Sequence, residues 1–394
     1  MIWNLVFKYL MFHKYKSLIM IGCIFLTALL PIVTKMLLWQ FNDRIMARSN
    51  STPAVIGARG SDLDLTLSTL YFKPGSVDTI PFSEVEKARD GELARAIPIH
   101  AMFTARDHSV VGTSLEYFQF RGLETGSGDM FTTLGECVIG SRVAKKHSLK
   151  PGDQIISDRE NVINLAGQSP LKLTIAGVLK ESRTSDDWTV FVDLKTAWVI
   201  QGLGHGHQDL SKEEKDSGAV LSRTDNAIVA SAAIAPYVEI TPDNIDSFHF
   251  HGDTSEFPIT SIIAIADNVK DETLLQGRYG SSEVAQFVKP DSVIQELMGL
   301  VFQVQKIFDA NAVLIAISTF LLLVLVILLS LRLRKREMET MFKLGCSRTT
   351  ISQVLIGELE VIFGIAIVLL VLAVCVIGSF SGDMIESLLV NGRF

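Results

Sequence analysis

Three runs of apolar residues constrain the fold of this chain more than any other feature. They cover residues 17–38, 310–331 and 361–380, and each is long enough to cross a bilayer as a helix, which takes about 20 apolar residues. The chain is apolar on average, with a mean hydropathy of +0.33, although 20% of its residues are charged. The apolar and charged residues must therefore be segregated, and the sequence predicts a membrane α-helical protein with three transmembrane helices.

The basic residues near these runs predict which side of the membrane each end faces. Lysines precede the first run, and a denser group of lysines and arginines follows the second. Such clusters stay on the cytoplasmic side of a membrane. Residues 1–16 combine aromatic and charged side chains and are predicted to form a cytoplasmic interfacial amphipathic helix. Residues 39–291 and the tail 381–394 are then expected outside the cytoplasm.

The region 39–291 is long enough to form one large domain or two smaller ones. Residues 63–72 alternate polar and apolar as a strand does, and Ser83 with Glu86 forms a capping box that starts a helix. We therefore predict a large α+β extracytoplasmic domain. The expected parts are an α+β core at 43–105 and 236–291 and an inserted β-rich subdomain at 106–235.

Composition limits what this outer region binds and how it is stabilised. Acidic side chains outnumber basic ones between Asp43 and Asp309, which argues against nucleic acid or anionic lipid headgroups as a ligand. Cys137 is its only cysteine, so the region cannot form an internal disulfide and must be stable through its own core.

The residues before the second apolar run predict a stalk. From residue 292 to residue 309, apolar side chains recur at intervals of three and four, as on one stripe of a helix. No helix breaker separates them from the run at 310–331, so one long helix is expected. The stripe needs a partner, either the extension of the first membrane helix or a second subunit.

The charged stretch 332–360 links the second and third apolar runs, and it is called the basic hairpin below. Its sequence predicts two short helices with a turn at Gly345 to Arg348, where Gly345 supplies the C-cap. A cytoplasmic partner that gripped this hairpin would pass force to both membrane helices. Glu358, where the third run begins, is expected to be solvated or paired with Arg348 or Lys343; a functional intramembrane carboxylate is the alternative.

The basic hairpin also carries a family resemblance. The chain resembles permease subunits of ABC transporters of the MacB/LolE/FtsX type, which act by mechanotransmission. The matching residues of the hairpin and the next helix are Arg336-Glu337, Met341, Leu344-Gly345-Cys346-Ser347-Arg348, Ile351, Glu358 and Gly364. Those of the outer domain are Val111-Gly112, Tyr117-Phe118, Val138-Ile139-Gly140, Ala144, Pro151-Gly152-Asp153 and Ile175-Ala176-Gly177-Val178. The family has four membrane helices, whereas this sequence shows three apolar runs.

The resemblance implies a bacterial inner-membrane protein whose large domain lies in the periplasm. It implies two copies of a partner ABC ATPase, a second permease subunit in a homo- or heterodimer, and a periplasmic adaptor or cargo protein or membrane lipid. The domain would act on a lipid, lipoprotein, peptide or periplasmic partner. The residues expected to couple to the ATPase are Arg336, Glu337, Leu344, Gly345, Ser347, Arg348, Ile351 and Glu358.

The chain itself is not expected to be an enzyme. It contains no G-x-x-x-x-G-K-[ST] phosphate-binding loop, so ATP would act through the partner subunit and no cofactor is expected to bind directly. It also contains no G-x-S-x-G nucleophile motif. A membrane scaffold that switches a cell-wall hydrolase or a sensor kinase is the alternative function.

Four of the eight histidines fall in two H-x-H-x-D patterns. In an extended segment alternate side chains share a face, so each pattern could hold one zinc ion. The candidate ligands are His205, His207, Asp209, His249, His251 and Asp253. They predict a zinc-responsive periplasmic receptor as a further alternative, although histidines also collect in surface loops without binding metal.

Overall fold

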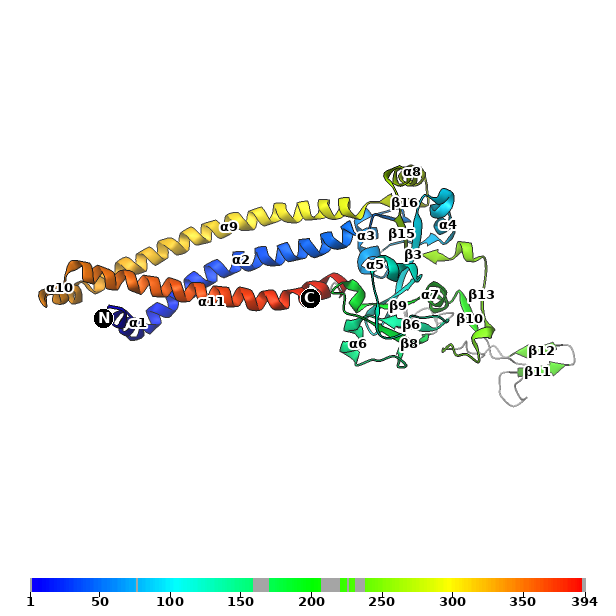
Figure 1. Ribbon diagram of the computed structural model, residues 1–394, viewed down its shortest axis with the longest axis horizontal. Coiled ribbons are helices and arrows are strands. Elements are labelled where there is room, and N and C mark those ends of the chain that lie inside the picture. Colours follow the sequence, from blue (N-terminus) through cyan, green and yellow to red (C-terminus); the bar gives the residue numbers. More distant parts are fainter. Residues whose placement is uncertain are drawn as a thin grey trace. The chain divides into compact units, whose positions relative to one another are not determined.

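The structure of the chain is a computed structural model (Figure 1) that describes residues 2–75, 77–158, 170–206, 220–224, 227–230 and 238–391. The chain divides into two compact units. Met1–Ile45 and Glu296–Ile385 form one, called the membrane-helix unit below, and Met46–Gln295 and Glu386–Phe394 form the other, called the globular unit.

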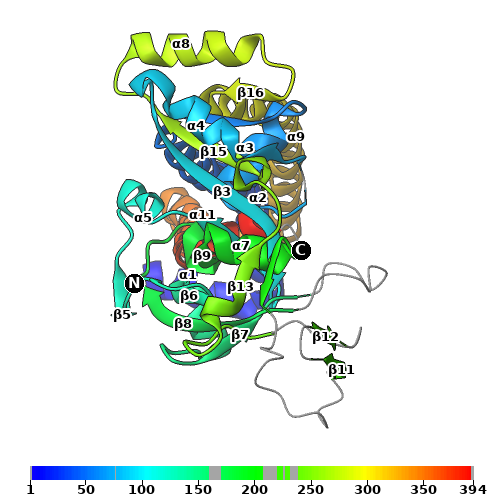
Figure 2. The same ribbon diagram turned by 90° about the vertical axis from the view of Figure 1, so that its right-hand side faces the viewer.

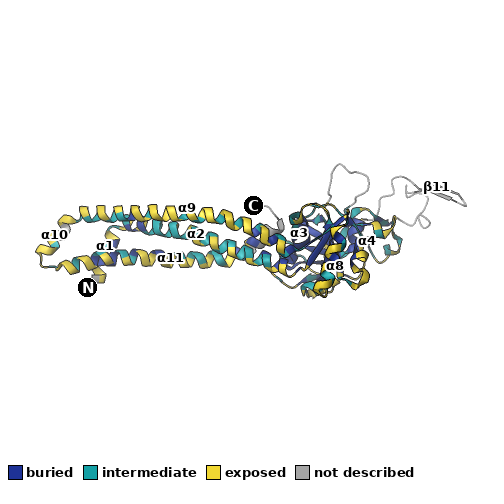
Figure 3. Cartoon of the chain, turned by 90° about the horizontal axis from the view of Figure 1, so that it is seen from above, coloured by how far each residue is buried: buried dark blue, intermediate teal, exposed yellow. Residues whose placement is uncertain are grey.

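Long helices make up the membrane-helix unit. It contains α1 (Ile2–Phe12), α10 (Lys335–Lys343) and most of α2 (Lys14–Asn50), α9 (Pro290–Leu333) and α11 (Arg348–Asn391). Among the described residues, three of them (α2, α9 and α11) are long and apolar enough to cross a membrane. Large apolar side chains along α9 are exposed, as the yellow ribbon in Figure 3 shows; Phe320 and Leu321 are examples. Lipid would cover such side chains, and the prediction of three long apolar helices is confirmed.

Polar contacts hold these helices side by side. The hydroxyls of Thr27 and Thr319 lie 3.1 Å apart between α2 and α9, and Ser381 on α11 donates a hydrogen bond to Gln40 on α2. The predicted stalk and second membrane run are one uninterrupted helix, α9. The third run differs from prediction, because α11 continues through residues 381–391, where we expected a tail. That segment contains no proline to stop the helix.

The globular unit is built on a mixed sheet of ten strands. In spatial order its path is β16 (Ala285–Val288), β1 (Ala54–Ala58), β15 (Ser261–Ile265), β3 (Arg95–Ala105), β4 (His108–Thr113), β9 (Val190–Asp193), β6 (Glu136–Ile139), β8 (Lys172–Leu179) and β5 (Thr125–Gly128), with β7 (Gln154–Ile156) also paired to β8. The β4–β9 and β6–β8 pairs are parallel, and the other pairs are antiparallel.

Helices pack against this sheet (Figure 2), and the globular unit also contains short two-stranded ladders. The two-stranded ladders are β2 (Ile80–Pro81) with β14 (Pro258–Ile259), β10 (Gly204–Gly206) with β13 (Phe248–Phe250), and β11 (Val220–Thr224) with β12 (Ala227–Ala230). The helices are α3 (Asp62–Tyr71), α4 (Ser83–Arg89), α5 (Glu116–Arg121), α6 (Ser141–His147), α7 (Leu194–Gln201) and α8 (Val269–Gly280).

The central strand β15 shows why the sheet lies between two apolar layers. Ile262 and Ala264 join one core cluster, which contains residues of α4, α7 and α8. Ile263 and Ile265 join another, which contains residues of α5. Because successive side chains of a strand point to opposite faces, a run of apolar residues fits a strand that is buried on both sides.

Two predictions for this unit differ from the structure. Residues 63–72 lie mostly in helix α3 rather than in a strand, because Ser61 caps the helix by accepting a hydrogen bond from the Asp64 amide and because Leu65 and Thr69, one turn apart, are both buried. The predicted boundary at residues 105 and 106 falls in the turn between β3 and β4, which pair with each other. The ten-stranded sheet therefore takes strands from both the expected core and the expected insertion, and both parts belong to one unit.

A substitution at Gly140 tests how tightly the globular unit is packed. A Cβ atom placed there would lie 2.3 Å from the carbonyl oxygens of Asp186 and Asp187, and this backbone cannot yield as a flexible side chain would. We expect Gly140→Ala to lower the free energy of unfolding by about 1–3 kcal/mol. Gly60→Ala is the control, because no atom lies within 4 Å of its Cβ position.

The buried thiol of Cys137 provides the measurement. Its alkylation in increasing urea, in full-length protein whose other cysteines are serine, reports the unfolding of the globular unit. Equal midpoints for the Gly140→Ala and Gly60→Ala chains would contradict the prediction.

Candidate functional site

The basic hairpin is an ordered turn between two helices. Helix α10 ends at Lys343, and Gly345 follows with a φ of +94°, a left-handed conformation that glycine adopts without strain. The amide of Cys346 donates to the carbonyl of Met341 at 3.0 Å and that of Gly345 to Phe342 at 3.0 Å, which closes the helix end. Helix α11 then starts, and the Ser347 hydroxyl accepts a hydrogen bond from the Thr350 amide at 3.1 Å.

The turn exposes apolar and cationic groups together. Leu344 is 81% exposed and Phe342 is 52% exposed. The Arg348 guanidinium lies over the Phe342 ring, 5.5 Å from its centroid. An apolar tip that is flanked by positive charge, on a turn fixed by its own backbone hydrogen bonds, is suited to insertion into a groove on a partner protein.

Further along α11 from the turn, one buried carboxylate contacts residues from other parts of the membrane-helix unit. Glu358 on α11 is 4% exposed, and its two oxygens each lie 3.0 Å from a cation: Lys16 on α2 and Arg334 between α9 and α10. Lys16 also donates to the Ser330 hydroxyl of α9 at 2.7 Å, and the Arg334 guanidinium lies 3.6 Å from the centroid of the Tyr9 ring on α1. These residues are called the Glu358 cluster below.

The Glu358 cluster corrects one expectation. Glu358 is neither solvated nor paired with Arg348 or Lys343, because its partners are Lys16 and Arg334. Lys16 lies 342 positions away in sequence, which placed it outside the local search for a partner. A lysine beside an apolar run was the available signal, since a charge that enters an apolar bundle must be paired.

The other predicted coupling residues lie in or beside the hairpin. Arg336 is exposed on α10, and Glu337 is on the same helix, although its side chain lies outside the described set. Ile351 is half-buried in the first turn of α11. The hairpin therefore gathers the predicted residues into one region, with Glu358 at its buried base.

A second buried ion pair lies in the globular unit, at the last turn of α2. The two terminal nitrogens of Arg48 contact the two oxygens of Asp186 at 2.6 and 3.0 Å. The Tyr117 hydroxyl donates to Asp186 at 2.6 Å, the Thr184 hydroxyl does so at 2.7 Å, and the Arg48 Nε donates to the Leu70 carbonyl at 3.3 Å. We call these residues the Arg48 cluster. Sequence reasoning missed it, because no local pattern joins Arg48 to Asp186.

The Arg48 cluster sets the ionisation of its carboxylate. Burial alone would raise the pKa of Asp186, but the charge and the hydrogen bonds of the Arg48 guanidinium outweigh burial and lower this pKa to about 2. Asp186 is therefore charged at neutral pH, and its negative charge balances a guanidinium that is also buried.

The histidine motifs have separate outcomes. His207 and Asp209 lie outside the described residues. His205, His249 and His251 come together from the two motifs, with candidate ligand atoms within 4.8 Å of one another. Asp253 instead accepts a hydrogen bond from the Ser255 amide at 2.9 Å and caps a short 3₁₀ turn, Thr254–Glu256.

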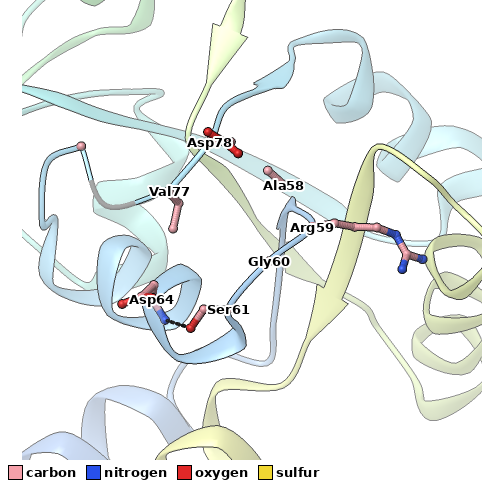
Figure 4. Close-up of a pocket in the computed structure, with 8 residues that line it drawn as sticks. Ala58, Arg59, Gly60, Ser61, Asp64, Val77 and Asp78 are labelled. Carbon is pink, nitrogen blue, oxygen red and sulfur yellow. Dashed lines mark hydrogen bonds between the residues drawn. The ribbon is translucent and has the colours of Figure 1, made fainter.

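An open hollow of about 230 Å³ lies where β1 ends and α3 begins (Figure 4). Asp64 and Asp78 line it. Arg59 also lines the hollow, and its guanidinium extends away from Asp64 and Asp78 to donate to the carbonyls of Ser282 and Gly280. The residues that line the hollow therefore carry charges of both signs.

The two units together define a class of protein: a membrane-anchored chain with a mixed α/β domain outside the lipid. The family model of the MacB-like periplasmic core domain matches residues 17–236, more than half of the chain. The chain therefore belongs to this family, and its resemblance to ABC transporter permeases of the MacB/LolE/FtsX type is confirmed. It is a membrane protein with a periplasmic domain and a permease-type component of an ABC transporter.

Solved structures include similar domains. The periplasmic region of MacB from Actinobacillus actinomycetemcomitans is 11% identical, with a TM-score of 0.36, over 64% of this chain and 97% of that chain. The extracellular domain of the noncanonic ABC-type transporter YknZ from Gram-positive bacteria is 13% identical, with a TM-score of 0.32, over 59% of this chain and 98% of that chain. A comparison with curated proteins gave no match.

The Arg48 cluster predicts how stability depends on pH. Asp186→Asn keeps the shape of the side chain but leaves the Arg48 charge buried without a counter-charge, so unfolding at pH 7 should become easier by about 3–5 kcal/mol. The folded pKa of Asp186, about 2, lies below the usual unfolded value of about 3.9. The stabilisation is therefore present above that unfolded value and is lost as pH falls towards 2.

Urea titrations compare the stability of wild type and Asp186→Asn at each pH. At neutral pH, unfolding is read by the alkylation of Cys137. At acidic pH, the chain is first unfolded in urea, and the sample is then quenched before the same reading. The difference between wild type and Asp186→Asn should narrow as the pH is lowered. Asp78→Asn, a change at an exposed carboxylate, should leave stability nearly unchanged. A difference that stays constant from pH 7 to pH 2.5 would show that the ion pair is not its source.

Proposed function

We propose that this chain is the permease subunit of an ABC transporter in a bacterial inner membrane, and that it converts ATP hydrolysis by a separate ATPase into movement of its periplasmic domain. The driven partner is a lipid, a lipoprotein, a peptide or a periplasmic protein. The observation that carries the proposal is the construction of the basic hairpin: an exposed tip whose base is tied by Glu358 to α2 and to the α9–α10 junction.

The tip supplies the contact with the ATPase. Leu344 and Phe342 present apolar surface, and Arg348 and Arg336 lie near it on the two helices. Two copies of the ATPase would each receive one such tip, from this chain and from a second permease subunit. The closing of the ATPase pair on ATP would then displace both hairpins.

The Glu358 cluster supplies the transmission. The hairpin cannot move independently of α2 and α9 while Lys16 and Arg334 hold the same carboxylate, because separating them would leave unpaired charges in an apolar setting. Helix α9 has no proline after its first residue, Pro290, and no break, so it resists compression along its axis. The ATPase would thus act on the periplasmic domain by mechanical force, rather than by opening a channel through the lipid.

A second permease subunit is supported by α9. Leu300, Val304 and Ile307 are 58%, 52% and 71% exposed and lie in the stretch predicted as a stalk. An apolar stripe that remains exposed in one chain is suited to the equivalent stripe of a second chain or of a related permease.

Capture of the ATPase tests the tip. Full-length chain is co-expressed with candidate ABC ATPases and purified in detergent, with and without the paired change Gly345→Pro and Arg348→Glu. We expect the wild type to retain an ATPase and the variant to lose it, because proline cannot adopt the φ of +94° that the turn requires. Lys195→Glu, a charge reversal at an exposed side chain of α7, is the control and should retain it. If wild type and the hairpin variant captured the ATPase equally, the hairpin would be only a connecting loop and the proposed contact would be wrong.

Glu358→Gln separates transmission from capture. This change leaves the tip intact but removes the charge that Lys16 and Arg334 share. We expect the complex to form as in wild type, while the stimulation of ATPase activity by the permease falls at least several-fold. Spectroscopic helix content and elution volume should stay unchanged. Full stimulation in the Glu358→Gln complex would contradict a role of the cluster in coupling.

A further inference from the structure

We propose that His205, His249 and His251 form a binding site for one zinc ion on the globular unit. The site is independent of the basic hairpin. It joins residues of both histidine motifs into a single site, whereas the sequence alone suggested one ion for each motif.

Strand pairing creates the cluster. β10 and β13 are antiparallel, and His205 lies directly opposite His249 in their register. His251 follows two positions after His249, so it points to the same side of the chain as His249 does, and its amide donates to the Leu203 carbonyl at 3.1 Å. Three imidazoles thus meet on one side of a ladder, although they come from segments more than 40 residues apart.

The opposite side of the ladder fixes this orientation. Phe248 and Phe250 alternate with the histidines and pack against the apolar core of the globular unit. Phe250 also contacts the rings of Trp198 and Phe257, with centroids 6.5 and 6.0 Å apart. Gly204 and Gly206 leave room for the two phenylalanine rings, since a Cβ on either glycine would lie 2.7 Å from a ring carbon. With the aromatic side buried, the imidazoles must face outwards.

The distances between the rings fit a tetrahedral ion. The Nε2 atoms of His205 and His251 lie 3.4 Å apart. Two nitrogens bound to tetrahedral zinc at about 2.0–2.1 Å are separated by about 3.3–3.4 Å. The observed spacing is longer than an ordinary hydrogen bond between nitrogen and oxygen, and it equals the edge of such a tetrahedron. The three ring centroids are 4.7 to 5.2 Å from one another, so small side-chain rotations bring the third nitrogen into range.

One ring nitrogen of His249 already makes a hydrogen bond. His249 Nδ1 lies 3.1 Å from the Ser247 carbonyl, and a carbonyl oxygen only accepts, so Nδ1 carries the proton. Its Nε2 then presents a lone pair, and the carbonyl holds the ring in orientation as second-sphere groups of zinc sites do. Three histidines leave the fourth position of the ion open to water or to an anionic group of a ligand.

Cobalt(II) and zinc binding to the full-length chain test the site. The protein is purified in detergent with an affinity tag that contains no histidines, and bound metal is removed with a chelator. We expect one cobalt ion per chain with the intense visible bands of four-coordinate geometry, and displacement of cobalt by zinc. Zinc affinity is then measured by competition with a chromophoric chelator.

Substitutions identify the ligands. His205→Gln, His249→Gln and His251→Gln should each weaken zinc binding by about tenfold or more and abolish the visible bands. The matched control is His147→Gln. His147 lies with its Nε2 3.1 Å from that of His108, so it is also a close histidine pair, but no third histidine or carboxylate is grouped with it among the described residues. This control should bind zinc as the wild type does.

Two results would overturn the site: wild-type zinc affinity in the chain with all three changes, or an equal loss in His147→Gln. All of these variants should still capture the ATPase. A failure of the zinc site would therefore leave the proposed coupling function untouched, and the converse holds as well.

Discussion

The pairing of buried charge at both ends of α2 is the constraint on which the rest of the structure depends. Near its start, Lys16 contacts Glu358 in the membrane-helix unit, and in its last turn Arg48 contacts Asp186 in the globular unit. A buried charge without a partner costs several kcal/mol, so each end of the helix has one acceptable rotation about its axis. Apolar side chains alone would tolerate sliding, whereas a two-point contact between Arg48 and Asp186 does not.

The two ion clusters suit different tasks. The carboxylate of Asp186 is surrounded by donors from Arg48, Tyr117 and Thr184, which makes a closed arrangement with little freedom to rearrange. Glu358 instead divides its two oxygens between Lys16 of α2 and Arg334 of the α9–α10 junction. Such a shared carboxylate suits the proposed movement of these helices as a group, and it lies about three turns along α11 from the exposed turn at Gly345. Helix α2 therefore has a closed ion cluster at Arg48 and a shared carboxylate at Lys16, which is consistent with the transmission of displacement proposed above.

The sequence predicts the parts of this structure that depend on local pattern. The three apolar helices follow from run length, the turn at Gly345 from the use of glycine as a helix C-cap, and the uninterrupted α9 from the lack of a breaker. The alternation of polar and apolar residues at 63–72 wrongly predicted a strand, because the Ser61 cap and tertiary packing favour a helix there. The single continuous sheet, the partners of Glu358 and the meeting of His205 with His251 depend on contacts between distant segments, which no local spacing encodes. The aromatic–histidine alternation at 248–251 was the one usable sign of a ladder with a buried side.

The position of Arg48 also bears on how such proteins diversify. Its carboxylate partner lies 138 positions downstream, beyond seven of the ten strands of the main sheet. The first membrane helix and the periplasmic domain are therefore not independent modules. A recombination event that joined the helix of one relative to the domain of another would inherit only half of the ion pair whenever the crossover fell after the last turn of α2. Exchanges should succeed with a crossover upstream of Arg48, so that the end of the helix is inherited together with the domain it enters.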